Sequence, residues 1–351
     1  MSKTQNVIIS QCLEKELEEA ITMETPDRLF LLTDTTTERL CVPVLSGFAC
    51  MKDALHIVIG ATDTHKNLDS LAQVWDALGA GGGTRHSLMV NLGGGMITDL
   101  GGFAASTFKR GIRFINIPTT LLSMVDASVG GKTGINFNGL KNEIGVFNDA
   151  DTVILDTQFL RTLDRENVCS GYAEMLKHGL ISDVATWSEL LDFDLFHVDY
   201  PHLQRMVATS VAVKQRVVET DPHEKGLRKA LNFGHTFGHA FESLALELQS
   251  PVLHGYAVAW GMICELYLSV LKAGFPHDKM HQTISFIKEC YGKFGLECKH
   301  YPKILEFMTH DKKNQAGVIN FTLLGDVGDI RINQTATKSE MEEALDFLRE
   351  G

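Results

Sequence analysis

The sequence predicts an α/β fold in two parts: a domain of parallel strands with crossover helices at 1–157, followed by an all-helical domain at 158–351. In the first part, short runs of β-branched and aliphatic residues alternate with helical stretches, which is the pattern of a nucleotide-binding α/β domain. In the second part, the apolar residues recur with the helical period. The junction of the two domains is therefore the expected place for a ligand cleft.

The individual elements follow from these patterns. Six strands are predicted in the first domain, at 6–9, 29–32, 55–59, 87–92, 114–117 and 152–155. Between them, 68–78 and 97–108 have apolar residues at helical spacing, and the glycines within 79–83 predict a turn. In the second domain, helices are predicted at 166–181, 203–219, 232–248, 256–271, 277–294 and 339–348.

Composition restricts the class of protein. With 351 residues and 44% hydrophobic content, the chain can form two globular domains of ordinary size. The net charge of -12 argues against general binding of nucleic acid or anionic membranes. The seven cysteines include no Cys-x-x-Cys pair, and their odd number favours reduced thiols in the cytoplasm. The N-terminal segment has no long apolar run, so neither a signal peptide nor a membrane span is expected.

Three glycines at 93–95 connect a predicted strand to a predicted helix. Bare backbone at a helix N-terminus can donate N–H groups to a pyrophosphate. The run does not match Gly-x-Gly-x-x-Gly, because Thr98 stands at the last position, and an ordinary tight turn is the alternative. Asp34 after the second strand and Thr119 and Thr120 after the fifth add polar groups suited to a dinucleotide. A Rossmann-like NAD-binding domain is therefore favoured.

A second glycine-rich run, Gly130-Gly131-Lys132-Thr133, resembles the end of a phosphate-binding P-loop. The glycine required five residues before Gly131 is replaced by Asp126, so an ordinary P-loop NTPase is not expected. Lys132, and Lys141 and Asn142 downstream, are candidates for phosphate contact. A solvated glycine-rich connection is the alternative.

The second domain contains a candidate metal site. One carboxylate, Glu174, and two imidazoles, His235 and His254, with an open fourth position are typical of catalytic zinc, since structural zinc is normally closed by four protein ligands. Core histidines that only pack are the alternative. Gly234 and Gly238 each precede a histidine, and each costs up to about 1 kcal/mol in a helix relative to Ala, so close approach of another group is expected there.

Groups suited to anions accompany the metal candidates. Lys177 is one helical turn from Glu174, and His239 is one turn from His235. Further groups of this kind are Lys214, Arg228 and Asn232, with Glu224 beside them. Taken alone, Arg110 would be explained as part of a charged helix end, and Lys312 and Lys313 as part of a solvated loop. Together these groups indicate a phosphate or carboxylate substrate.

Four motifs closely resemble the 3-dehydroquinate synthases, a family of the sugar-phosphate cyclase superfamily. They run from Asn91 to Phe103, from Ile117 to Gly134, from Asn232 to His239 and from Leu253 to Gly255. The resemblance covers nearly the whole chain, in the same order. It implies a dehydroquinate synthase-like fold, with a Rossmann-like NAD-binding domain and a helical metal-binding domain.

The resemblance also implies roles for individual residues. It makes Glu174, His235 and His254 the ligands of Zn2+, with Co2+ as an alternative ion. It implies that eight residues surround the substrate: Asp126, Lys132, Asn142, Lys177, Lys214, Arg228, Asn232 and His239. Arg110 and one of Lys312 or Lys313, with Lys313 preferred, would reach the substrate from further away. It implies NAD contacts from Asp34, Asp63, Lys66, Gly94, Gly95, Asp99, Thr119, Thr120, Lys141 and Thr162.

The implied reaction is the shikimate-pathway step of aromatic amino acid biosynthesis that converts 3-deoxy-D-arabino-heptulosonate 7-phosphate to 3-dehydroquinate and phosphate. NAD+ removes hydride from C5, the ketone acidifies C6 for phosphate elimination, and NADH returns the hydride, while zinc polarises the C5 oxygen. The enzyme is then a carbon-oxygen lyase. Lys132, Asn142 and His239 are expected at the phosphate and Lys214 and Arg228 at the carboxylate, with His239 also in a proton relay.

Three residues depart from the usual pattern of the family: Asp63 and Asn167 stand where Glu is common, and Ala127 where Ser is common.

Three other functions compete with this hypothesis: another sugar-phosphate cyclase, a metal-dependent alcohol dehydrogenase of the glycerol dehydrogenase type, and a non-catalytic binding protein on the same fold. The cations at Lys132, Lys177 and Arg228 would have no evident purpose in the dehydrogenase. A homodimer is expected from the resemblance alone.

Overall fold

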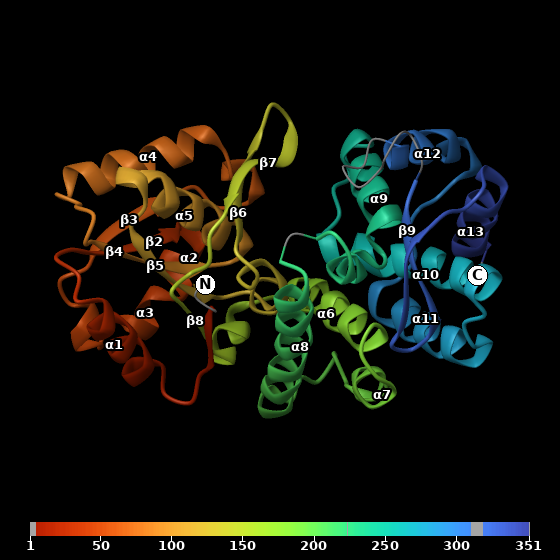
Figure 1. The fold of residues 1–351 in the computed structure, drawn as a ribbon, viewed down its shortest axis with the longest axis horizontal. Coiled ribbons are helices and arrows are strands. Elements are labelled where there is room, and N and C mark those ends of the chain that lie inside the picture. The colour runs from red at the N-terminus through yellow and green to blue at the C-terminus, as the bar shows by residue number, and fades with distance from the viewer. Residues whose placement is uncertain (1–4, 223, 310–318, 351) are drawn as a thin grey trace. The chain divides into compact units, whose positions relative to one another are not determined.

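The structure is a computed structural model that describes residues 5–222, 224–309 and 319–350. The chain forms two compact units (Figure 1). The first comprises Met1–Asp164 with Tyr200–Val211, and the second comprises Arg165–Asp199 with Ala212–Gly351. The division after Asp164 lies a few residues beyond the predicted boundary, and the inclusion of Tyr200–Val211 in the first unit was not predicted.

The first unit is built on a six-stranded sheet in the order β1-β8-β5-β4-β2-β3, with every neighbouring pair parallel. All six predicted strands are present: β1 (Asn6–Ile9), β2 (Leu29–Asp34), β3 (Leu55–Ile59), β4 (Leu88–Gly93), β5 (Arg113–Pro118) and β8 (Thr152–Leu155). Every residue of β4 is buried, as expected for a central strand with both faces covered. Figure 1 shows α4 and α5 on one side of this sheet and α1 and α3 on the other.

The helices of this unit are α1 (Leu13–Glu24), α2 (Thr35–Leu40), α3 (Val42–Leu45), α4 (Leu68–Ala80) and α5 (Gly95–Thr107). The predictions for α4 and α5 are confirmed within a few residues. The first three were not predicted, although α1 buries Leu13, Leu17, Ala20 and Ile21 at helical spacing.

An antiparallel hairpin, β6 (Lys132–Phe137) and β7 (Leu140–Phe147), follows the second glycine-rich run. A phosphate-binding run or a glycine-rich connection was predicted here, and neither strand was expected. Gly134 and Gly145 face each other in the register, and a Cβ on either would overlap the opposite backbone, so the glycines permit the pairing. This hairpin carries Lys132, Lys141 and Asn142.

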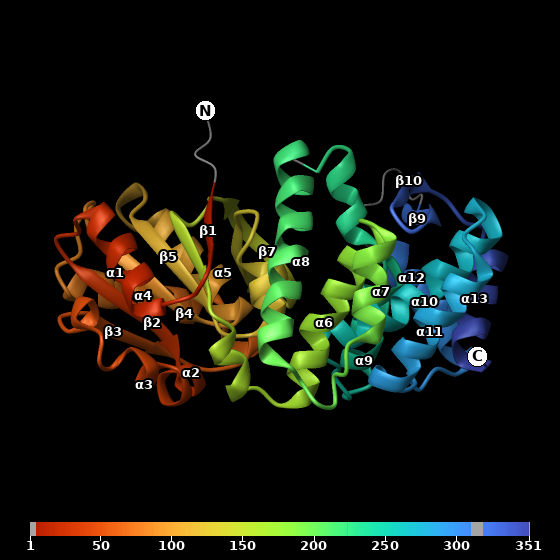
Figure 2. The same cartoon turned by 90° about the horizontal axis from the view of Figure 1, so that it is seen from below.

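The second unit is mainly helical, as predicted. Its helices are α6 (Arg165–Leu180), α7 (Val184–Asp192), α9 (His235–Glu247), α10 (His254–Ala273), α11 (His277–Tyr291), α12 (Tyr301–Thr309) and α13 (Lys338–Glu350), while α8 (Tyr200–Thr220) contributes to both units (Figure 2). The unit is not all-helical, however, because β9 (Phe321–Asp326) and β10 (Asp329–Gln334) form an antiparallel hairpin. On β10, exposed and half-buried residues alternate, so only a weak hydrophobic signal marks the strand.

The helix α10 is the core of the second unit. Thirteen of its residues, from Gly255 to Ser269, are buried. By length and mean hydropathy it is the single described helix that could cross a membrane, but 67% of the qualifying window is buried within the protein. It is therefore explained as a core helix.

Candidate active site

The three predicted metal ligands lie together in the second unit, each on a different helix. Glu174 is in the middle of α6, His235 is the first residue of α9, and His254 is the first residue of α10. The Oε1 atom of Glu174 is 3.3 Å from His235 Nε2 and 3.4 Å from His254 Nε2. Both histidines therefore direct the same type of ring nitrogen at one carboxylate oxygen.

Glycines at the helix contacts allow the ligands to meet. A Cβ on Gly234 would lie 2.9 Å from the Val258 carbonyl oxygen, and one on Gly238 would lie 3.1 Å from that of Ala257. A Cβ on Gly255 would overlap the backbone of α6. The expectation that Gly234 and Gly238 permit a close approach is confirmed, and the approaching group is α10.

Opposed charges dominate the electrostatics of this cluster. Lys177, one turn after Glu174 and fully buried with it, donates to Glu174 Oε2. Burial alone would raise the pKa of Glu174, but Lys177 and the histidines outweigh it and hold the pKa well below its usual range. Burial alone would lower the pKa of His254, but Glu242 and Glu174 outweigh it and raise that pKa to about 10. The site therefore holds an ionised carboxylate in a field that attracts positive charge.

The donor set fits a divalent metal. The buried Oε1 atom of Glu174 makes no hydrogen bond of acceptable geometry among the described residues, although two imidazole nitrogens face it. The three ligand atoms all lie within 4.8 Å of one another. One carboxylate oxygen and two imidazole nitrogens are the donors that zinc takes in catalytic sites with an open position.

Two further buried carboxylates touch the segments that carry the histidines. Glu242 on α9 lies 3.2 Å from Nδ1 of His254. Glu265 on α10 accepts hydrogen bonds from the backbone N–H groups of Gly234 and Thr236. Neither residue was predicted as a site residue. Glu265 could have been found, because it is a lone acidic residue within the apolar run of α10, whereas nothing in the sequence around Glu242 indicates a role.

The predicted anion-binding groups of the second unit are also buried or partly buried. Arg228 is 3% exposed and Lys214 is 6% exposed. Arg228 donates to the carbonyl of Pro222, and the Asn232 amide donates to Glu224. The ring centroid of His239 lies 5.3 Å from that of His235 and 6.1 Å from that of His254. His239 is therefore beside the metal candidates, and the Arg228 and Lys214 side chains are held in the interior of the second unit.

The segment that carries Arg228 and Asn232 lies before the α-helix, although the predicted helix included Asn232. The predicted helix at 232–248 begins only at His235, because the preceding segment Leu227–Asn232 forms a 3-10 turn and Gly234 has a left-handed φ of 81°. Arg228 and Asn232 lie at two positions of this turn, and neither belongs to α9.

In the first unit, several of the predicted cofactor residues lie at the carboxyl ends of β2, β4 and β5, namely Asp34, Gly94, Gly95, Thr119 and Thr120. Gly94 is the N-cap of α5, and no side chain caps it. Lys66 donates to Asp99 at 2.5 Å and to Asn142 at 2.5 Å. The structure therefore places Asn142, predicted at the substrate phosphate, among the predicted cofactor residues.

The remaining cofactor candidates have neighbours of their own. Asp34 caps α2 by accepting from the N–H groups of Thr36 and Thr37. The buried thiol of Cys41 lies near Thr162, Asp34 and Thr119, and burial raises its pKa. This cysteine therefore lies among three predicted NAD contacts, and its residue type gave no sign of it. Asp63 accepts from the Asn136 amide at 3.1 Å.

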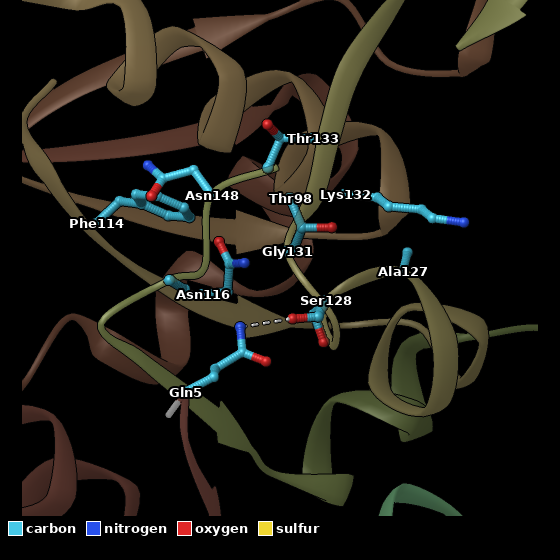
Figure 3. A pocket seen from close by; sticks show the side chains of 11 residues that line it. Gln5, Thr98, Phe114, Asn116, Ala127, Ser128, Gly131, Lys132, Thr133 and Asn148 are labelled. Carbon is cyan, nitrogen blue, oxygen red and sulfur yellow. Dashed lines mark hydrogen bonds between the residues drawn. The ribbon is translucent and has the colours of Figure 1, made fainter. Parts of the chain in front are cut away.

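Other predicted residues of the first unit are at the surface. Lys132, Lys141 and Arg110 are exposed, and Arg110 has a left-handed φ of 69° after α5. A polar cavity of about 10 Å³, lined in part by Asn116 and Ser128, lies beside the glycine-rich run. Figure 3 shows the Lys132 side chain pointing away from it. The cavity has room for about one water molecule and is too small for a phosphate.

Two of the predicted substrate contacts, Lys312 and Lys313, lie outside the described residues. Asp126 lies in a short π-helical segment, Ser123–Ala127, after β5.

Comparison with known proteins identifies the family. The model of the 3-dehydroquinate synthase N-terminal region matches residues 56–170, and that of the C-terminal region matches residues 171–314. The 3-dehydroquinate synthase of Parabacteroides distasonis is 54% identical over 346 residues, which cover 99% of this chain and 98% of that protein. The chain belongs to the 3-dehydroquinate synthase family.

A more distant relative and a solved structure agree with this assignment. A 3-dehydroquinate synthase of Streptococcus pyogenes is 34% identical over 348 residues, covering 99% of this chain and 97% of that protein. The structure of 2-epi-5-epi-valiolone synthase from Streptomyces hygroscopicus, with NAD+ and Zn2+ bound, has a TM-score of 0.86 at 25% identity, covering 100% of this chain and 98% of that one. The predicted family, its fold and its lyase class are therefore confirmed, while the roles of individual residues stay predictions.

Proposed function

We propose that the protein converts 3-deoxy-D-arabino-heptulosonate 7-phosphate to 3-dehydroquinate and phosphate, with NAD and a divalent metal, zinc first and cobalt as the alternative. Family membership supports the reaction. The observation that carries the proposal within this chain is the triad of Glu174, His235 and His254, whose donors fit an open metal site beside the buried Lys177. The proposed setting is the cytoplasm, without nucleic acid or membrane.

When bound, the metal supplies Lewis acidity at the substrate hydroxyls and NAD+ supplies a reversible hydride acceptor. The protein's own part is to bind and orient the substrate and to move protons. Lys177 keeps the Glu174 carboxylate ionised and oriented through their buried ion pair. His239, beside the two ligand histidines, is placed to accept the proton of a substrate hydroxyl and pass it to solvent.

The two ends of the substrate carry different charges, and we assign different groups to them. Arg228 and Lys214 bind the carboxylate, because a guanidinium and an ammonium group form charge-assisted hydrogen bonds with carboxylates. Asn232 contributes its amide, and Glu224 orients that amide by accepting from it. A related cyclase substrate without a carboxylate would leave Arg228 and Lys214 without this ionic complement.

Lys132 and Asn142 are assigned to the phosphate, with Asp126 near the same groups and Arg110 and Lys313 reaching from further away. The contact of Asn142 with Lys66 bears on this role, since the amide oxygen accepts from Lys66 and only its N–H groups could donate to a phosphate. Asn142 would then join the cofactor residues to the substrate.

NAD is assigned to the first unit. The N-terminus of α5 at Gly94 and Gly95 presents backbone N–H groups suited to the pyrophosphate. Asp34, Asp63, Lys66, Asp99, Thr119, Thr120, Lys141 and Thr162 complete the proposed contacts. Because Asp34 already caps α2, its carboxylate would bind a ribose hydroxyl with the oxygen that the cap leaves over.

Release of inorganic phosphate tests the function. With NAD+ far below the substrate concentration, we expect many turnovers per NAD+, no accumulation of NADH, and loss of activity with a chelator. Stoichiometric NADH without phosphate would support the dehydrogenase alternative. Turnover of a sedoheptulose phosphate in preference to the heptulosonate phosphate would support another cyclase. The predicted homodimer is tested separately by light scattering.

A further inference from the structure

Two buried carboxylates, Glu242 and Glu265, have no part in the function proposed above. Glu242 is 8% exposed and Glu265 is fully buried. Each lies on the helix that begins with one of the ligand histidines, and each contacts the start of the other helix. Glu242 on α9 reaches His254 at the start of α10, and Glu265 on α10 reaches the start of α9.

The contact of Glu242 determines which nitrogen of His254 is available as a ligand. A neutral imidazole has one N–H group and one free lone pair. Nδ1 of His254 lies 3.2 Å from Glu242 Oε2, while Nε2 lies 3.4 Å from Glu174 Oε1. If Nδ1 donates to Glu242, the lone pair is on Nε2, which faces the metal position. Glu242 thus selects the tautomer and the ring orientation that a metal requires.

Glu265 acts on the backbone around His235. It accepts from Gly234 N at 2.7 Å and from Thr236 N at 3.1 Å, one through each carboxylate oxygen. These two N–H groups flank His235, and the turn is unusual because Gly234 has a φ of 81°. Nδ1 of His235 lies 3.1 Å from the Phe233 carbonyl, so donation from it leaves Nε2 for the metal.

A second cation held by His239, Glu242 and His254 is the competing explanation for Glu242, since their ligand atoms also lie within 4.8 Å of one another. That cation would have to share His254 with the first site. Both ring nitrogens would then be ligands, which requires the imidazole to lose its last proton. A hydrogen bond from Nδ1 to Glu242 requires no such ionisation and is favoured.

We propose that Glu242 and Glu265 are positioning residues that hold the two ligand histidines in the metal-binding orientation, each carboxylate acting from one helix on the start of the other. The proposal rests on the metal site of the proposed function. It adds that metal affinity depends on the pairing of α9 with α10, through groups that touch neither metal nor substrate.

The test measures metal affinity of the purified full-length protein after metal removal, by competition with a chromophoric chelator. Truncation of a residue that orients a ligand typically weakens metal affinity about 10–100-fold, and we expect this for Glu242→Ala. Glu242→Gln keeps an oxygen that accepts from Nδ1, so we expect a smaller loss. Glu265→Gln should also weaken binding, because its amide nitrogen would face a backbone N–H. Glu247→Gln, at the exposed end of α9, is the matched control and should stay within about twofold of the parent.

Two further measurements separate positioning from other roles. The thermal midpoint of each metal-free variant detects general loss of structure, and kcat at saturating metal should recover for Glu242→Gln if the carboxylate acts only through His254. If Glu265→Gln does not fold, Glu265→Asp, which keeps the charge but shortens the reach, is measured in its place.

The outcomes distinguish this proposal from the one on which it rests. A parent protein that binds no metal would refute the metal site itself. A parent that binds one ion, with Glu242→Ala or the Glu265 variant within twofold of it, would refute the positioning role of that residue. Two ions per chain, reduced to one by Glu242→Ala, would replace positioning by the second cation site.

Discussion

Substitution of Gly234 by alanine should disrupt both the helix contact and the metal site. The left-handed φ of 81° costs a residue with a Cβ about 1–2 kcal/mol. The added Cβ would also lie 2.6 Å from Met262 Cγ and 2.9 Å from the Val258 carbonyl oxygen. Overpacking of this kind costs about 1–3 kcal/mol, so the free energy of unfolding should fall by about 2–5 kcal/mol. Because His235 is the next residue, metal affinity should fall as well.

Gly274→Ala is a closely matched control. Gly274 caps the C-terminal end of α10 with a φ of 79°, and a Cβ there would meet nothing within 4 Å. Urea unfolding followed by tryptophan fluorescence gives the free-energy change of each variant, and chelator competition gives metal affinity. Gly274→Ala should show the backbone cost alone, with unchanged metal affinity. If Gly234→Ala is no more destabilising than Gly274→Ala and binds metal as tightly as the parent, the argument from close helix approach is refuted.

The remaining predictions concern single side chains. His235→Ala should abolish metal binding and turnover but leave NAD affinity unchanged by isothermal titration calorimetry; loss of NAD affinity in a folded variant would contradict the assignment of NAD to the first unit. Arg228→Ala should lower kcat/KM with the heptulosonate phosphate by about 30-fold to several thousand-fold, since removal of one partner of a buried ionic contact costs about 2–5 kcal/mol, and Arg228→Lys should remain clearly impaired because it loses the planar fork. Activity of both Arg228 variants within twofold of the parent would exclude a carboxylate contact. Iodoacetamide at pH 8 should modify the exposed Cys12 and Cys298 before Cys290, because burial raises the pKa of Cys290 to about 12 and leaves it almost wholly protonated, as peptide mass spectrometry can check.

The six parallel strands were predictable because each is a short, mainly apolar run between turn residues. In β4 and β8 every residue is buried, so no alternation of apolar and polar residues is needed there. The hairpin β6–β7 was not predictable from the sequence, since all eight residues of β7 are exposed and no buried face produces an apolar pattern. The hairpin β9–β10 was missed for a related reason, because its second strand is at most half-buried. Burial does not account for every case, because β9 has four buried residues and was also missed, whereas β1 has none and was predicted.

The metal candidates were predictable from residue type and from the resemblance to the family. The role of Glu242, which contacts the ligand His254, was not predictable. A Glu in a helix is usually exposed, and only tertiary packing buries Glu242 against His254. The start of α9 was misplaced because periodicity does not distinguish the 3-10 turn at Leu227–Asn232 from an α-helix. Residues that act through another side chain therefore require the packed structure.

The burial of α10 also determines how the protein should respond to loss of its metal. In small zinc domains the ion supplies the free energy of folding, so its removal unfolds the chain. Here the helix that begins with His254 is buried along most of its length, and it packs against α6, α9, α11, α13 and the strand β9. The ion should then stabilise an already folded unit by mass action, by about 2.7 kcal/mol at one hundred times its dissociation constant. Loss and recovery of metal can therefore control activity reversibly, without a cycle of unfolding and refolding.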